Sequence, residues 1–143
     1  MKLFDKKDSV LVLFWADPDA IASAFALKKI LQNRVALITL TPVNEIRRLN
    51  NLVMIESLKI PLVAYNPSML NNYNKYILVD SQPYHREEFK NISFTGIIDH
   101  HPITEDLSAP YVDIRPQYGA TSSILYEYLN TLKIRPNVYL STA

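Results

Sequence analysis

Cysteine is absent from the 143 residues of this chain. Its absence excludes disulfide bonds and thiolate metal ligands, so any bound metal must be held by oxygen or imidazole ligands. Long apolar runs are also missing, since no stretch approaches the roughly 20 residues that cross a bilayer. The first eight residues, MKLFDKKD, are too charged for a secretory signal. We therefore expect a cytoplasmic protein that does not act in a membrane.

The chain also lacks an excess of either charge. It has 15 Lys and Arg against 14 Asp and Glu, which gives no reason to expect tight binding of a long nucleic-acid duplex. A nucleotide or a short oligonucleotide is the more suitable nucleic-acid partner. The length, with an apolar content of 48%, is sufficient for one core and too short for two domains. We expect a single domain without repeats, linkers or low-complexity segments.

Short aliphatic and β-branched runs alternate with amphipathic helical patterns along the chain. This alternation is typical of βαβ units and predicts an α/β fold: a three-layer α/β/α Rossmann-like domain with a mostly parallel five-stranded sheet. The predicted strands are residues 9–14, 35–40, 61–65, 76–79 and 94–98, with a further extended piece at 111–114. The predicted helices are residues 19–32, 45–58 and 120–132, with the start of another at 137–143. The inner stripe of the second helix is predicted to be Ile46, Leu49, Leu52 and Val53.

Carboxylates follow three of the predicted strands, and histidines follow one. The residues concerned are Asp17, Asp19, Asp80, Asp99, His100 and His101. Because open parallel sheets have their sites at the carboxyl ends of the strands, we expect these side chains along one edge. Four carboxylates there would repel one another unless protons or a cation neutralised them. Aspartate with histidine suits Mn²⁺ or Mg²⁺, with Zn²⁺ or Fe²⁺ as alternatives.

Each of these groups, taken alone, also has an ordinary structural explanation. Asp17 can cap a helix whose first turn contains Pro18 and Asp19. Asp80 can form a turn. Single histidines usually make ordinary hydrogen bonds, but a tandem pair after an aspartate at a strand end favours a functional role.

Together, the motifs resemble those of the DHH phosphoesterase superfamily, over nearly the whole chain. The first motif is similar to DPDAIASA at residues 17–24, the second to LVD at 78–80 and the third to IIDHHP at 97–102. The segments VDIRP and GATSS, at 112–116 and 119–123, resemble the segments that come after the third motif in several bacterial members. The family includes RecJ-type exonucleases, NrnA-type oligoribonucleases and phosphatases, and cyclic-dinucleotide phosphodiesterases.

The resemblance implies a site for two metal ions, Mn²⁺ or Mg²⁺. Asp17 and Asp80 would bind one ion, while Asp19, Asp80 and His100 would bind its neighbour, so that Asp80 bridges the two. A pair of ions of this kind supplies hydroxide and stabilises charge during in-line displacement at phosphorus.

The resemblance also implies catalytic roles for Asp99 and His101. Asp99 would orient His100 from behind the metal ligands, and His101 would face the substrate phosphate or the leaving oxygen. Arg115, outside the three motifs, could hold a substrate phosphate through two hydrogen bonds, or could form a surface salt bridge instead.

Other polar residues have simpler interpretations. Thr121 and Ser122 could cap the helix that comes after them, whose N-terminus could alternatively bind an anion. Arg47 and Arg48 are interpreted as a solvated helix face, and His85 as part of a surface loop.

Two features depart from the family pattern. Leu13 stands where the family usually has a metal-binding histidine, and Trp15 stands where asparagine is common, so the metal site served by Asp17 would be incomplete. The family's fourth motif, an aspartate, and its substrate-binding domain would lie beyond Ala143. We therefore expect an N-terminal piece of a longer protein, itself inactive or nearly so. The full-length protein could form a homodimer.

The sequence is compatible with two functions. The leading hypothesis is metal-dependent hydrolysis of phosphodiester or phosphomonoester bonds in short oligonucleotides or small nucleotides. The alternative is a degenerate DHH domain that acts as a nucleotide-binding or protein-binding regulatory module. Leu13 favours the module, whereas the intact Asp17, Asp19 and Asp80 and the intact DHH motif at residues 99–101 favour the enzyme.

Overall fold

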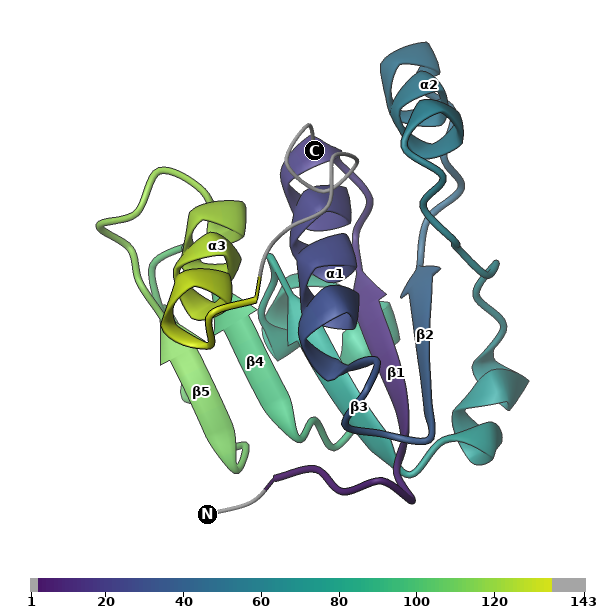
Figure 1. Ribbon diagram of the computed structural model, residues 1–143. Helices are drawn as coiled ribbons and strands as arrows, with labels where there is room; N and C mark the ends of the chain where they lie inside the picture. Colours follow the sequence, from purple (N-terminus) through teal and green to yellow (C-terminus); the bar gives the residue numbers. More distant parts are fainter. Residues whose placement is uncertain (1–2, 135–143) are drawn as a thin grey trace.

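The computed structural model describes residues 3–134 and contains one five-stranded, all-parallel sheet (Figure 1). The order of the strands is β2-β1-β3-β4-β5. Their bounds are β1 Ser9–Phe14, β2 Leu37–Pro42, β3 Lys75–Val79, β4 Gly96–Asp99 and β5 Tyr111–Ile114. The predicted α/β, Rossmann-like fold is confirmed.

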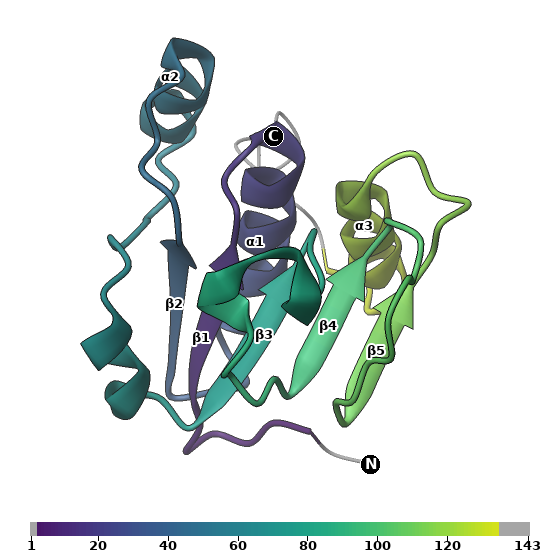
Figure 2. The same cartoon turned by 180° about the vertical axis from the view of Figure 1, so that it is seen from behind.

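Helices cover the two faces of the sheet in different ways. On one face lie α1 (Pro18–Leu31) and α3 (Thr121–Thr131), side by side (Figure 1). The short 3₁₀ helices η2 (Pro83–His85) and η3 (Glu87–Phe89) lie across the other face (Figure 2). A further 3₁₀ helix, η1 (Pro67–Asn72), precedes β3. None of the described helices is long and apolar enough to span a membrane.

Side chains of the central strand β1 alternate between two separate cores. Val10, Val12 and Phe14 belong to the core under α1 and α3, and Leu11 and Leu13 belong to the core on the other face. All five are fully buried. Because successive residues of a strand point to opposite faces, a strand covered on both faces is apolar throughout. This burial explains the uninterrupted run VLVLF.

One of the five predicted strands is not part of the sheet, and another segment takes its place. Residues 61–65 do not form a strand and pair with the sheet at one isolated bridge, between Leu40 and Leu62. Pro61 has no N–H to donate, and Leu40 is close to the end of β2, so the pairing cannot extend. The fifth strand is instead the extended piece at 111–114, which pairs in parallel with β4.

The second helix was also predicted wrongly in its bounds and its buried face. It is α2 (Leu49–Ser57), and its buried residue is Asn51. Of the predicted inner stripe, Leu49, Leu52 and Val53 are 71%, 44% and 51% exposed. These side chains are exposed because α2 stands beyond the carboxyl end of β2 and does not lie on the sheet (Figure 1). The predicted helix start at 137–143 lies outside the described residues.

Candidate metal centre

The predicted site residues lie at the carboxyl edge of the sheet, where the order of the strands reverses. The chain moves outward from β1 to β2 on one side and to β3 on the other, and ligands of open α/β sheets bind at such a switch point. Asp17 and Asp19 follow β1, and Asp80 follows β3. Asp80 has a φ of 59°, in the left-handed region that aspartate tolerates better than most residues.

His100 lies between two of the carboxylates. Its Nε2 is 3.7 Å from Asp19 Oδ2 and 3.6 Å from Asp80 Oδ1. Its Nδ1 is 3.2 Å from the carbonyl oxygen of Tyr118. A carbonyl only accepts, so Nδ1 donates to it, and in the neutral ring Nε2 then presents a lone pair to the two carboxylates. Thus His100, Asp19 and Asp80 are brought together as the sequence predicted.

The spacing of these three acceptors suits a metal ion. The distances of 3.6 and 3.7 Å exceed a hydrogen bond. Two ligands bound to one ion at about 2.1 Å from it lie roughly 3.0–3.5 Å apart. A small inward movement of the side chains would therefore bring His100 Nε2 and either carboxylate oxygen to the spacing of two ligands of one ion. His101 is a further potential metal ligand, because one ligand atom each of Asp80, His100 and His101 lies within 4.8 Å of the other two.

Burial and the crowding of carboxylates raise the pKa of Asp80. Its side chain is buried, and burial, followed by the charges of Asp19 and Asp17, raises the pKa of Asp80 to about 9. Thr121 Oγ1 donates a hydrogen bond to Asp80 Oδ1 at 2.9 Å and opposes the shift only in part. Among residues 3–134, no Lys or Arg forms an ion pair with Asp17, Asp19 or Asp80. A proton or a cation must therefore neutralise the group.

Asp19 binds the N-terminus of α3. Its Oδ2 accepts the backbone N–H of Thr121 at 2.9 Å, and its Oδ1 accepts that of Ser122 at 2.8 Å. Burial opposes ionisation, but these two N–H groups hold the pKa of Asp19 below its usual range. The prediction that Thr121 or Ser122 caps this helix is wrong, because both lie inside its first turn. The N-terminus does bind an anion, and that anion is the carboxylate of Asp19.

Asp17 has the capping role that its place in the sequence allowed. Its Oδ1 accepts the backbone N–H of Ala20 at 2.8 Å, and it is the N-cap of α1, with Pro18 in the first turn. Its charge still contributes to the raised pKa of Asp80. Leu13 is fully buried in the core on the opposite face from α1 and supplies no ligand.

Asp99 binds a different histidine from the one predicted. Its Oδ1 accepts a hydrogen bond from His101 Nδ1 at 2.7 Å, whereas His100 is oriented by a backbone carbonyl. Its Oδ2 accepts from Gln82 Nε2 at 2.9 Å, and Gln82 Oε1 accepts from Tyr84. The expected link from Asp99 to His100 is therefore wrong. Asp99 is the last residue of β4, and His100, just after the strand, contacts the carbonyl of Tyr118 instead.

His85 has a place near the site that the sequence did not predict, since it was expected on the surface. Its ring packs edge-on against His101, with 5.7 Å between centroids, and one ligand atom each of His85, Asp99 and His101 lies within 4.8 Å of the others. A metal there is disfavoured, since His85 Nδ1 accepts the N–H of Gln82 at 3.0 Å, so that Nε2 carries the proton of the neutral ring. The sequence feature that could have indicated this place is the short separation of His85 from Asp80, five residues along the chain.

Hydrogen bonds to protein groups occupy four of the five N–H donors of Arg115. Its Nε and Nη2 both lie 2.9 Å from the carboxylate of Asp113, and Nη1 binds Glu127 and, at 2.9 Å, the hydroxyl of Tyr118. Both carboxylates raise the pKa of Arg115. These contacts join β5 to α3 and favour the salt-bridge interpretation of Arg115 over the phosphate-binding one.

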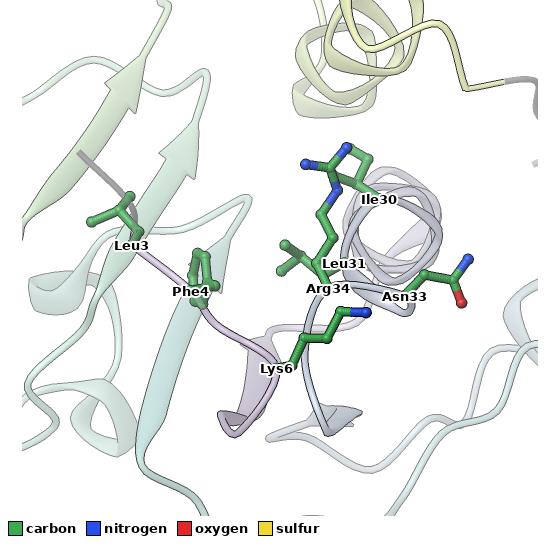
Figure 3. A pocket seen from close by; sticks show the side chains of 7 residues that line it. All are labelled: Leu3, Phe4, Lys6, Ile30, Leu31, Asn33 and Arg34. Atoms are coloured by element: carbon green, nitrogen blue, oxygen red, sulfur yellow. The ribbon is translucent and has the colours of Figure 1, made fainter.

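A hollow at the opposite edge of the sheet has no metal-ligating chemistry. It lies between the N-terminal segment and the end of α1, with a volume of about 390 Å³ (Figure 3). Its lining has two cations, Lys6 and Arg34, and no carboxylate or histidine. The carboxyl edge is therefore the candidate site.

Comparison with known proteins shows the family of the chain. Residues 9–142 match the model of the DHH family, N-terminal domain. The chain is also 38% identical, over 141 residues, to an uncharacterized protein of Methanocaldococcus jannaschii. This alignment covers 97% of the chain and 29% of the relative, so the chain spans less than a third of that protein's length.

Proposed function

The chain belongs to the DHH family, and we propose that it is the metal-binding part of a phosphoesterase. Its substrates would be the phosphodiester or phosphomonoester bonds of short oligonucleotides or small nucleotides. Since the chain spans 29% of the relative that it matches, the activity and substrate of the whole protein are part of this proposal.

The observation that carries the proposal is the convergence of acceptors around His100 Nε2. In the neutral ring this nitrogen carries a lone pair, and it faces Oδ2 of Asp19 and Oδ1 of Asp80 at 3.7 and 3.6 Å. An all-acceptor group of carboxylate oxygens and imidazole nitrogen fits Mn²⁺ or Mg²⁺. Such an ion, when bound, lowers the pKa of a coordinated water and neutralises charge on phosphoryl oxygens.

The chain's own residues would position the substrate and the ligands. The carbonyl of Tyr118 holds the His100 ring, and the N-terminus of α3 holds Asp19. Asp99 accepts the Nδ1 proton of His101, which leaves Nε2 of that ring to face a phosphate oxygen or a leaving group. This fixed geometry is the contribution that a protein makes to phosphoryl transfer, where most catalysis is positioning and charge stabilisation.

A regulatory module is the second candidate, and Leu13 is the observation that favours it. A fully buried leucine replaces a usual ligand of the family, so the ion next to Asp17 would be weak or absent. A domain that binds a nucleotide or a protein without turnover could tolerate this loss.

Metal binding by the chain itself is the first test. Calorimetric titration with Mn²⁺ should give at most one weakly bound equivalent. Asp80→Ala should weaken binding by roughly tenfold or more, since it removes the shared oxygen ligand. Asp106→Asn, an exposed position without a hydrogen bond or ion pair among residues 3–134, is the matched control. Unchanged binding by Asp80→Ala would contradict the proposed site, and two tight equivalents would contradict our interpretation of Leu13.

Hydrolysis is the second test, made on the whole protein. Hydrolysis of bis-p-nitrophenyl phosphate or a dinucleotide should require Mn²⁺ or Mg²⁺, stop on addition of EDTA, and fall by roughly a hundredfold or more in Asp80→Ala. Equal rates for wild type and Asp80→Ala would eliminate the enzyme. Nucleotide binding without any turnover would support the regulatory module.

A further inference from the structure

A second hollow opens at the carboxyl edge, beside the metal centre. It has a volume of about 420 Å³, within the range of small-molecule sites. Its walls come from the loop after β1, from the segment between β2 and α2, and from the loop after η2. Asp17 forms part of the wall. A ligand in this hollow, which we call the arginine cleft, would therefore lie next to the proposed metal ligands.

Arginines give the cleft its charge. Arg47, Arg48 and Arg86 line it, together with Asp17 and Glu45. Glu45 is paired with Arg47 at 2.9 Å, in an exposed and therefore screened salt bridge. In the part of the chain that the structure describes, Arg48 and Arg86 form no ion pair with a carboxylate. Unlike Arg115, these two side chains keep their donors available for an anion.

Trp15 holds one of these arginines in place. The guanidinium carbon of Arg86 lies 3.8 Å from the centroid of the indole ring. A guanidinium held over an aromatic ring by a cation–π interaction can still donate its N–H groups to an anion. The ring also reduces the rotamer freedom that Arg86 would lose on binding an anion, which favours affinity.

We propose that Arg48, Arg86 and Trp15 form a phosphate subsite in the arginine cleft. It takes a phosphate of the substrate other than the one that is hydrolysed, through the paired N–H groups that match phosphate oxygens. The proposal rests on the proposed function, and it specifies the substrate class. Nucleotides with two or more phosphates are preferred over compounds that carry a single phosphate.

The single tryptophan of the chain makes this subsite directly measurable. Trp15 is the only tryptophan, so its fluorescence reports ligands that enter the cleft. Titration is done in EDTA, without metal, using ADP, inorganic pyrophosphate and AMP at low ionic strength. We expect saturable binding of ADP, roughly tenfold tighter than AMP because a second charged phosphate is bound. Pyrophosphate separates recognition of the phosphates from recognition of the nucleoside.

Variants assign the binding to the two arginines. Arg48→Ala should weaken ADP binding by roughly tenfold, and the added Arg86→Ala should weaken it further. Arg86→Ala also alters the surroundings of Trp15, so the double variant is followed by calorimetry. Arg86→Lys keeps the charge without the planar fork and should restore binding only in part. Arg34→Ala, in the hollow at the other edge of the sheet (Figure 3), is the matched control and should bind ADP as wild type does.

Three results would overturn the subsite. The first is that wild type shows no saturable ADP binding by fluorescence or by calorimetry. The second is equal affinity for ADP and AMP, and the third is unchanged ADP affinity in the double variant. Because EDTA removes the metal, these results do not depend on catalysis. A protein that binds ADP through the arginines but hydrolyses nothing would remove the proposed hydrolase and leave the subsite standing.

Discussion

Asp99 is fully buried and accepts two hydrogen bonds, one from His101 Nδ1 and one from Gln82 Nε2. Each oxygen of the carboxylate therefore faces a donor. Tyr84 donates to the oxygen of the Gln82 amide, which prevents that amide from turning over without loss of a bond. The network fixes the proton of His101 on Nδ1 and leaves Nε2 as the nitrogen that meets a ligand.

Asp99→Asn should reverse the tautomer of His101. The new NH₂ group must face either Gln82 Nε2, where two donors would meet, or His101 Nδ1, which would then have to accept. We expect the neutral ring to carry its proton on Nε2, as ¹⁵N chemical shifts of the imidazole would show. The free energy of unfolding should fall by about 1–3 kcal/mol, because a buried polar bond is lost or mismatched. Persistence of the Nδ1–H form in Asp99→Asn would contradict this assignment, and Asp106→Asn serves as control.

At the scale of elements, one aspartate joins the start of α1 to the start of α3. Asp19 lies in the first turn of α1 and accepts two backbone N–H groups of α3, over a sequence separation of more than a hundred residues. Helix N-termini have unpaired donors and a positive dipole end, and both favour a carboxylate. Asp19 thus has a stabilising role that does not require metal.

Asp19→Ala should therefore destabilise the metal-free protein by about 1–2 kcal/mol, the usual cost of a lost N-cap. Asp19→Asn keeps an acceptor oxygen and should cost less. Both should weaken binding of Mn²⁺. Denaturant unfolding in EDTA measures the first effect and calorimetry the second. If Asp19→Ala unfolds like wild type in EDTA, the capping role is wrong, whatever happens to metal affinity.

At the scale of the whole molecule, burial is unevenly distributed. Nine residues of α1 are buried, whereas α2 buries Asn51 alone and stands beyond the end of β2 (Figure 1). Local opening costs less where few apolar contacts are broken. Backbone amides of α2 should exchange with solvent deuterium faster than those of α1, by roughly a hundredfold or more. Hydrogen exchange followed by mass spectrometry tests this, and equal protection of the two helices would contradict it.

The sequence predicted most of the fold, because hydrophobic periodicity is a local property. Strand β1 and helices α1 and α3 were predicted to within about two residues of their observed ends. Residues 61–65 and α2 were predicted wrongly, since pairing and burial depend on the elements that lie beside a segment. An apolar pattern at 61–65 is compatible with a strand. Only the structure shows that its pairing with β2 is limited to one bridge.

By itself, the sequence determined that aspartates and histidines would follow the strands and gather at one edge, because parallel strands end on the same side. Only the tertiary structure decided the partner of each side chain. Asp99 binds His101 and not His100, Asp19 binds α3, and Arg115 binds the carboxylates of Asp113 and Glu127. The physical reason is that a hydrogen bond depends on the direction of a side chain and on packing between elements far apart in the chain, neither of which is visible in the order of residues.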